Sequence, residues 1–423
     1  MMTQIRLLVT ALLLVMVALT VPLKAEVLID GFLQNLQGAR LDETNPTATE
    51  LTASETRFQL RAEHFGDAGE FFARLDFVYD GADTGAYNWE LREGYLKFQL
   101  GNNLDFKLGR QILTWGTGDL VFINDVFAKD YQSFFTGRDD QYLKAPQNAL
   151  RADYYTGLGS FSLVWTPQFE PNQLPTGRKL SYFNGEEIVG ESQLFSSTVP
   201  ASRFDNGEFA FRLNRTIGSF SSALYFYRGF YKNPMGVEMD MSGPTPIPLL
   251  VYPKLNLYGA SIRGPMFGGI IWLEGGYYDS RDDADGTDPL MPNSQLAGLL
   301  GFERQVATNL TANVQWQVEY MLDHDLYRMQ NETAGMFVRD EIRHLVTSRI
   351  TKMLADELLT LSGFVFFSPT DEDAYVRLSA GYKYSDEITL AAGANIFDGK
   401  YEATDFGQFQ KNDNAYLKVT YGF

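Results

Sequence analysis

The sequence predicts an all-β protein, a single transmembrane antiparallel β-barrel of about 18 strands, with 16 strands as the open alternative. Three observations predict this class. Segments of about ten residues alternate between apolar and polar positions, connections are short and long in turn, and the final segment ends on an aromatic residue. Beyond the leader, no apolar run reaches the length of a membrane-spanning helix. Strands are therefore the expected means of crossing a membrane.

The expected strands follow one another along the chain after the leader. Residues 71–79 put Phe77 on one face and Asp76 on the other, and the same period of two governs 309–320 and 374–384. Similar alternation occurs around 57–63, 104–109, 149–155, 208–214, 257–263, 271–277 and 341–350. A tilted strand needs about ten residues to cross a bilayer, so these segments have the required length.

The connections between these segments alternate in length. The tight turn at 66–69 is followed by a longer loop near 80–88, and the tight turn at 101–103 by a long one at 111–146. The pattern continues with long connections at 168–204, 228–254, 280–294 and 322–340, each preceded by a short turn. Outer-membrane barrels distribute short periplasmic turns and long extracellular loops in this way. Both chain ends are therefore expected on the periplasmic side.

The last ten residues, NAYLKVTYGF, form the clearest alternating segment. Leu417, Val419, Tyr421 and Phe423 share one face, and Lys418 lies on the other. We expect Tyr421 and Phe423 to face lipid and to close the barrel, with Lys418 facing the lumen. This ending resembles the closing strand of bacterial outer-membrane barrels, and the resemblance implies that the barrel assembly machinery recognises it.

The first residues are expected to form a leader rather than part of the fold. Arg6 precedes the apolar run 7–21, and PLKA and Glu26 follow it. This pattern is typical of a secretory signal peptide cleaved after Ala25, so the expected division is 1–25 for the signal and 26–423 for the barrel. The alternative, a membrane anchor, would need a run of about 20 apolar residues.

Composition excludes several functional classes. The chain has 53 acidic and 35 basic residues and a net charge of −18, which argues against a nucleic-acid partner. It has no cysteine, so neither a disulfide framework nor thiol chemistry is expected. The three histidines, His64, His324 and His344, lack the companions of a nucleophilic or HExxH site. We therefore expect no enzyme activity, no cofactor and no bound metal.

A more particular resemblance lies in the second quarter of the chain. The stretch Leu91–Tyr131, with LKAPQNALRADYY (143–155) and TPQFEPNQLP (166–175), resembles the uncharacterised outer-membrane proteins of the DUF1302 type. The matching pieces are Gly109-Arg110-Gln111, Trp115-Gly116, Asn124-Asp125 and Pro167 to Pro175. The resemblance covers about a fifth of the chain and implies a barrel fold, and some members of the family are suspected of handling hydrophobic compounds.

The polar faces of the expected strands predict the residues that line the lumen. An Arg at the lipid midplane costs about 2–4 kcal/mol, so charged side chains are expected to point inward. The expected lining residues are Arg57, Arg61, Arg74, Asp76, Arg151, Asp153, Arg212, Glu274, Glu319, Arg343 and Arg377. They could create a transverse field that filters solutes by charge, or they could form a wall of paired, solvated side chains.

The segment 115–146 is the third long loop, and it combines many aromatic and aliphatic residues with acids. A loop so apolar is expected to pack against something rather than extend into water. We expect it to fold inward and narrow the lumen, with Asp119, Asp125 and Asp130 near the solute path. A packed extracellular cap is the alternative.

Together these features predict a porin-like channel in the bacterial outer membrane that passes small molecules passively. The alternatives are a channel for uptake or export of hydrophobic compounds, a non-conducting structural barrel and, from the enzyme class, a membrane-embedded hydrolase. Expected partners are outer-membrane lipids, the barrel assembly machinery and small solutes, and a homo-oligomer is left open. The sequence indicates neither the substrate nor its charge.

Overall fold

The structure is a computed structural model that describes residues 27–423 except 43, 67–68, 84–85, 192–196, 202 and 244–245. The expected signal peptide, residues 1–25, lies outside the described residues. No helix in the described part of the chain is long and apolar enough to cross a membrane.

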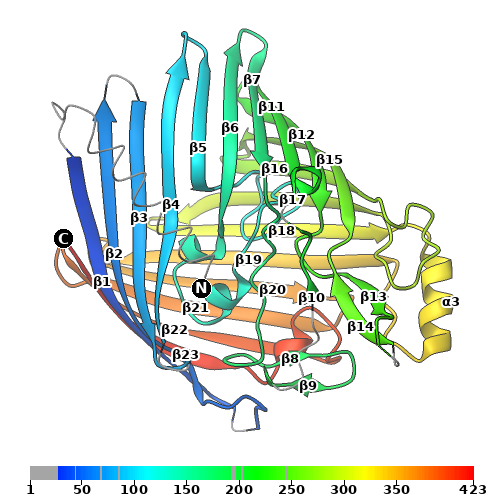
Figure 1. The fold of residues 1–423 in the computed structure, drawn as a ribbon. Helices are drawn as coiled ribbons and strands as arrows, with labels where there is room; N and C mark the ends of the chain where they lie inside the picture. The colour runs from blue at the N-terminus through cyan, green and yellow to red at the C-terminus, as the bar shows by residue number, and fades with distance from the viewer. Residues whose placement is uncertain are drawn as a thin grey trace.

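Eighteen strands form one sheet that closes on itself (Figure 1). They are β1 (Val27–Arg40), β2 (Leu51–Gly66), β3 (Gly69–Asp80), β4 (Ala86–Leu100), β5 (Leu104–Ile112), β6 (Pro146–Thr156), β7 (Gly159–Thr166), β11 (Glu208–Ile217), β12 (Phe220–Phe230), β15 (Lys254–Met266), β16 (Gly269–Ser280), β17 (Gln295–Ala307), β18 (Leu310–Met321), β19 (Ile342–Leu354), β20 (Leu359–Ser368), β21 (Asp373–Lys383), β22 (Ile388–Gly399) and β23 (Asn414–Gly422). The expectation of an antiparallel barrel with 18 rather than 16 strands is confirmed.

The barrel closes where the first strand meets the last. β1 pairs antiparallel with β23 from Phe32↔Gly422 to Arg40↔Asn414. Beyond this ladder, Gly31 and Phe423 exchange both backbone hydrogen bonds at 3.0 Å. Closure leaves no unpaired sheet edge, which is the requirement for a sheet surrounded by lipid.

Smaller elements lie in the connections. They are α2 (Tyr131–Phe135), η1 (Asp140–Leu143), β8 (Tyr182–Phe183), β9 (Ile188–Val189), β10 (Ser197–Thr198), η3 (Phe204–Asn206), β13 (Gly236–Asp240), β14 (Ile247–Val251), α3 (His324–Ala334) and η4 (Gly407–Phe409). β13 and β14 form a hairpin outside the barrel sheet, and β10 joins it in parallel.

The connections divide into two ends of the barrel. The turns after β2, β4, β6, β11, β15, β17, β19 and β21 contain between two and four residues, and these define the short-turn end. Most other connections are longer, and the segment 113–145 between β5 and β6 is among the longest. The one departure from the expected pattern is the four-residue connection 369–372, which lies at the long-loop end.

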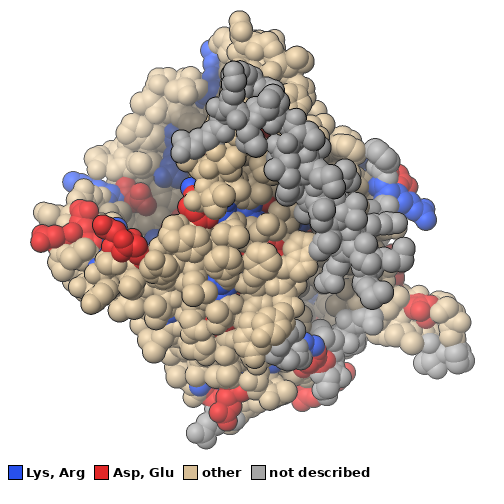
Figure 2. Space-filling view, turned by 60° about the vertical axis from the view of Figure 1, so that its left-hand side comes forward, with Lys and Arg blue, Asp and Glu red and all other residues tan. Residues whose placement is uncertain are grey.

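Each barrel strand turns alternate side chains toward the outside and the inside of the barrel. On β23, the outward side chains of Leu417 and Val419 are 66% and 50% exposed, whereas inward Tyr416 is buried. Outward Val314 on β18 alternates with buried Gln315 in the same way. Uncharged residues make up most of the surface visible in Figure 2, with charged side chains in small groups. An apolar outer wall is what contact with lipid requires.

Candidate functional site

The segment 113–145, here called the inner loop, lies inside the ring of strands, where it appears in cyan to teal in Figure 1. Asp130 caps the N-terminus of the short helix α2, and its carboxylate accepts a hydrogen bond from the Ser133 backbone at 2.8 Å and another from the Ser133 hydroxyl. An aspartate at this position satisfies one of the free N–H groups of the first turn. The loop is therefore folded, and its side chains are presented to the inner wall in fixed positions.

Glu274 on β16 holds the first half of the inner loop. One carboxylate oxygen accepts from the backbone N–H and hydroxyl of Thr117, at 2.6 and 2.8 Å, and the other accepts from the backbone and side-chain amides of Asn124, at 2.8 and 3.0 Å. Glu274 is buried, and a side chain at Gly116 would place its Cβ only 2.8 Å from the carboxylate. Because Gly116 also has φ +80°, glycine suits the position in both space and conformation.

Gln315 on β18 binds the same half of the loop through its backbone. Its amide oxygen accepts from the Asp119 N–H, and its amide nitrogen donates to the Asp119 carbonyl, both at 2.8 Å. The Asp119 carboxylate forms an ion pair with Arg349 on β19 at 2.9 Å. Burial raises the pKa of Asp119 above its ordinary value, and the nearby Arg349 only partly opposes this shift.

The second half of the loop enters a network of buried charges on β2 and β3. Arg138 pairs with Glu55, Glu55 also pairs with Arg57 at 2.8 Å, and Arg57 pairs with Asp76. The ring of Tyr142 lies under the Arg57 guanidinium, with the Arg57 Cζ 4.3 Å from the ring centroid. Buried charges of this kind are tolerated because each has an opposite charge as partner.

Two neighbouring loop acids reach the strands on the other side of β1. Asp139 pairs with Lys418 on β23, and Asp140 pairs with Arg377 on β21 at 2.6 Å. Asp140 also lies 3.6 Å from Arg349. The loop is thus bound to strands on different sides of the barrel and spans its interior.

Aromatic contacts add to these polar ones. Phe135 packs edge-on against Tyr375 and Phe397, with ring centroids 5.4 and 5.3 Å apart. Near the start of the loop, Trp115 packs against Tyr225 on β12 at 6.0 Å. Edge-to-face pairs at such distances stabilise beyond the apolar area that they bury. The inner wall therefore carries apolar patches, which the loop covers.

Several of the expected lining residues form ion pairs with other residues of the barrel strands. Arg61 pairs with Asp30 at 2.6 Å, Arg74 with Glu93 at 3.4 Å, and Arg151 with Asp153 at 2.7 Å. At the long-loop end, Arg343 pairs with Glu319 at 3.4 Å, and with Asp371 and Asp405. Arg212 lies 5.4 Å from the centroid of the Trp115 ring.

Two of the three acids expected at the solute path are located differently. Asp125 and Asp130 are both 6% exposed. Asp125 pairs with the buried Lys129 at 3.0 Å, and Asp130 caps α2. Both carboxylates serve the internal packing of the loop, because a folded loop needs partners for its own N–H and ammonium groups. Asp119 is less buried and reaches the inner wall.

Sequence reasoning missed the contacts that dock the loop. Gln315 was expected to face the lumen but not to bind the loop, Glu55 and Tyr142 were not singled out, and Asp139 and Asp140 were seen only as members of an acidic loop. Glu55 and Gln315 do lie on the predicted inward faces of their strands, which is the one signal that the sequence offers. Their partners depend on how the loop folds, and strand periodicity does not contain that information.

A second long connection lies against the inner loop. Gln173, in the connection between β7 and β11, accepts a hydrogen bond from the Tyr131 backbone at 2.9 Å and forms a bridge with Asp130. Farther along, Ser181 donates to Asn412, in the connection before β23, at 2.9 Å. The long-loop end is therefore a packed layer of several connections rather than a set of separate loops.

Comparison with known proteins agrees with this architecture. Residues 83–285, just under half of the chain, match the model of a family described as "Protein of unknown function (DUF1302)". The stretch that resembles this family in sequence, from Leu91 to Pro175, lies within the match. None of the curated proteins searched matches the chain.

Solved structures with a similar fold include OccK3 (OpdO) of Pseudomonas aeruginosa, with a TM-score of 0.57 and 10% identity, covering 94% of this chain and 96% of that one. A loop-deletion mutant of OmpT, an outer membrane protein of Vibrio cholerae, is similar with a TM-score of 0.43 and 12% identity, and the alignment covers 94% of this chain and 99% of that one. A triple mutant of Rhodopseudomonas blastica porin is similar with a TM-score of 0.41 and 11% identity, and the alignment covers 94% of this chain and 100% of that one. The chain is thus a closed 18-stranded barrel with a porin-like fold, and its residues 83–285 carry the match to the DUF1302 family.

Proposed function

We propose that the protein is an outer-membrane channel that passes small molecules passively, with the inner loop as its constriction. The observation that carries the proposal is the span of this loop from Glu274 and Gln315 on one side to Arg377 and Lys418 on another. A segment fixed at both sides of a barrel reduces the cross-section open to a solute. A rigid constriction also allows discrimination by size and charge.

The charges at the inner edge of the loop support a polar pathway. Asp119, Asp139 and Asp140 face Arg349, Arg377 and Lys418 across ion pairs. These pairs place charged groups along the boundary between the loop and the wall, and charged groups beside a passage favour polar over apolar solutes. The sum of these charges does not favour one sign, so the proposal is a channel for small polar molecules without a strong preference for cations or anions.

The proposal places the protein in the bacterial outer membrane. An apolar outer wall and long connections at one end support this location, with the short-turn end in the periplasm. Membrane lipids, the barrel assembly machinery and small solutes are the partners that follow from it.

A channel for hydrophobic compounds is the second candidate. Exposed methionines at the long-loop end favour it: Met239 and Met241, at the tip of the β13–β14 hairpin, are 46% and 71% exposed. Flexible, polarisable side chains suit apolar compounds of varied shape. The inner wall beside α2 is also aromatic, although the inner loop covers that part of it.

Solute flux into liposomes distinguishes these functions. Purified barrel is reconstituted, and the uptake of neutral sugars, amino acids, organic anions, organic cations and apolar aromatics is measured against protein-free liposomes. We expect small polar solutes to enter and uptake to fall steeply with size. Faster entry of apolar aromatics alone would favour the second candidate, and flux equal to that of empty liposomes would favour a non-conducting structural barrel.

A further inference from the structure

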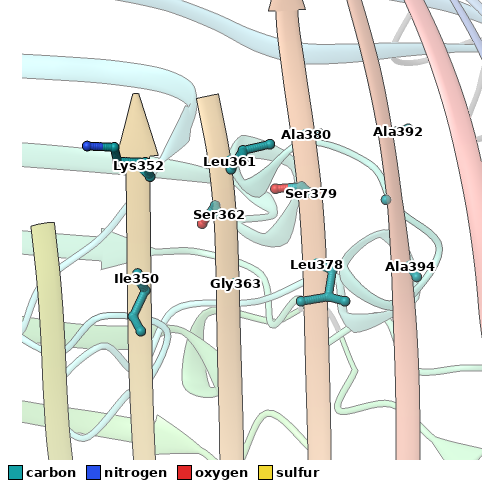
Figure 3. Close-up of a pocket in the computed structure, with 11 residues that line it drawn as sticks. Ile350, Lys352, Leu361, Ser362, Gly363, Leu378, Ser379, Ala380, Ala392 and Ala394 are labelled. Carbon is teal, nitrogen blue, oxygen red and sulfur yellow. The ribbon is translucent and has the colours of Figure 1, made fainter. Parts of the chain in front are cut away.

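The outer surface of the barrel has two shallow grooves. The first, shown in Figure 3, crosses β19 to β22 and has a volume of about 550 Å³. The second crosses β11 to β16 and has a volume of about 610 Å³. Both lie on the face that the proposed function turns toward lipid.

The first groove exists because small residues face outward where large ones are the rule. Gly363, Ala380, Ala392 and Ala394 occupy adjacent positions on three strands, and larger residues flank them (Figure 3). A Cβ added at Gly363 would lie 3.5 Å from Leu378, so even a methyl group there would meet the wall of the groove. The opening is long, apolar and shallow, a shape that suits a hydrocarbon chain.

A single base, Lys352, borders the short-turn end of this groove, and its ammonium group points away from Leu361 toward the turn before β18 (Figure 3). Lys352 lies two residues before the end of β19, on the same outward face as Ile350. Its ammonium group donates to the Thr308 carbonyl at 2.9 Å and has two further hydrogens to donate. No carboxylate of the described residues forms an ion pair with it, although Asp356 and Glu357 lie in the adjacent turn.

The second groove repeats this arrangement on a different part of the barrel. Ser222, Ala260 and Gly275 are its small outward residues, and Leu213 and Leu273 are among its apolar sides. Arg215, two residues before the end of β11, lines it at the short-turn end. Glu274 also borders the groove, but its carboxylate is bonded to the inner loop on the other face of the sheet.

The distribution of charge on the outer wall indicates what the two grooves accept. At the short-turn ends of the barrel strands, the outward-facing bases are Arg215, Arg304 and Lys352. The outward-facing acids of the described barrel strands, Asp279 and Asp398, both lie at the long-loop end. The base at the short-turn end of each groove therefore favours an occupant that carries a negative charge at that end.

We propose that each groove binds one phospholipid of the periplasmic leaflet, with an acyl chain in the groove and the phosphate on Lys352 or Arg215. The inference rests on the membrane location in the proposed function, but not on solute transport. Long basic side chains near the membrane interface direct their charge toward the headgroups, and anionic lipids bind to such positions. A second copy of the chain fits less well, because the outward acids of its barrel strands lie at the long-loop end, away from these bases.

Native mass spectrometry of the full barrel in detergent, titrated with phosphatidylglycerol, tests this assignment. Lys352→Gln and Arg215→Gln should each weaken one of two sites by about fivefold, and the double variant should weaken both. Arg304→Gln is the matched control, because Arg304 faces outward at the same end but lines neither groove. Ala380→Phe fills the first groove and should abolish lipid binding there, although Lys352 is still present. Ala73→Phe, on the outer wall of β3 and outside both grooves, is the control for adding a large side chain to the outer wall.

Every variant is first checked for folding by its heat-modifiable mobility. Equal affinity for phosphatidylglycerol in Lys352→Gln, Arg215→Gln and Arg304→Gln would overturn the proposal. Dissociation of an oligomer by Ala380→Phe, with lipid binding unchanged, would show instead that a second copy fills the groove. Displacement of the lipid by inorganic phosphate alone would exclude a role for the acyl chain. A barrel that binds lipid in this way but passes no solute would contradict only the proposed function.

Discussion

At the scale of single residues, the inner loop depends on two polar side chains of the inner wall, each of which satisfies loop backbone groups. Glu274 accepts two backbone N–H groups, and Gln315 binds both the N–H and the carbonyl of Asp119. Inside a barrel, such backbone groups would otherwise be buried without a partner, at a cost of about 1–3 kcal/mol each. These two residues thus fix where the loop docks.

Replacing Glu274 by glutamine tests this role. Whichever way the new amide is turned, the backbone N–H of Thr117 or of Asn124 faces an NH₂ group and loses its acceptor. We expect docking of the loop to weaken by about 1–3 kcal/mol and tryptic cleavage at Lys129 and Arg138 to accelerate. Glu63→Gln, on the inner face of β2 away from the loop, is the control, and equal cleavage rates in the two variants would contradict the role of Glu274.

Phe423 carries a second prediction at this scale. Its ring stacks on Phe58 with centroids 5.9 Å apart, and its backbone pairs with Gly31 at the closure of the barrel. Phe423→Ser removes the aromatic end of the outward face, so the folded fraction in a heat-modifiable mobility assay should fall. Phe423→Tyr should preserve it, and an unchanged folded yield with serine would show that the ring has no part in assembly.

At the scale of elements, the sequence predicted the strands. For the inner loop it predicted the inward fold but not the contacts. Period-two alternation predicted the outward face of β23 and β18, because burial on one side of a strand leaves a direct mark on the sequence. The inward fold of residues 113–145 was expected from their apolar content. The sequence did not predict which acids of the loop reach the wall. Asp125 and Asp139 are equivalent in the sequence pattern, and only the folded loop with its helix α2 pairs Asp125 internally and Asp139 with the wall.

The Asp119 ion pair gives a pH prediction for this element. Because burial raises the pKa of Asp119 in the docked loop, the docked form binds this proton more tightly than a free loop does. Docking should therefore strengthen as the pH falls through a window above the ordinary aspartate pKa of 3.8 and weaken as the pH rises through it. Because the docked loop narrows the channel, acidification should reduce the open-channel current of the parent. Asp119→Asn should remove the part of this pH dependence that comes from Asp119. A current that rises on acidification, and does so less in Asp119→Asn, would contradict the assigned sign.

At the scale of the whole molecule, the alternation of short and long connections predicted a closed barrel with 18 strands, since a barrel keeps all its turns of one kind at one end. The solute remained beyond prediction from sequence. Its identity depends on the space left between the inner loop and the opposite wall, and that space is set by contacts between residues far apart in the chain, such as Arg138 with Glu55 and Asp140 with Arg377.

The most direct test of the central claim is single-channel conductance in planar bilayers for the parent and for a variant lacking residues 118–142. The deletion leaves all 18 barrel strands intact, so the barrel should fold, as heat-modifiable mobility can verify. If the inner loop is the constriction, the deletion should raise the conductance and let larger ions pass, so that selectivity by size is reduced. A folded deletion variant that conducts like the parent, with the same selectivity, would place the constriction elsewhere and contradict the account.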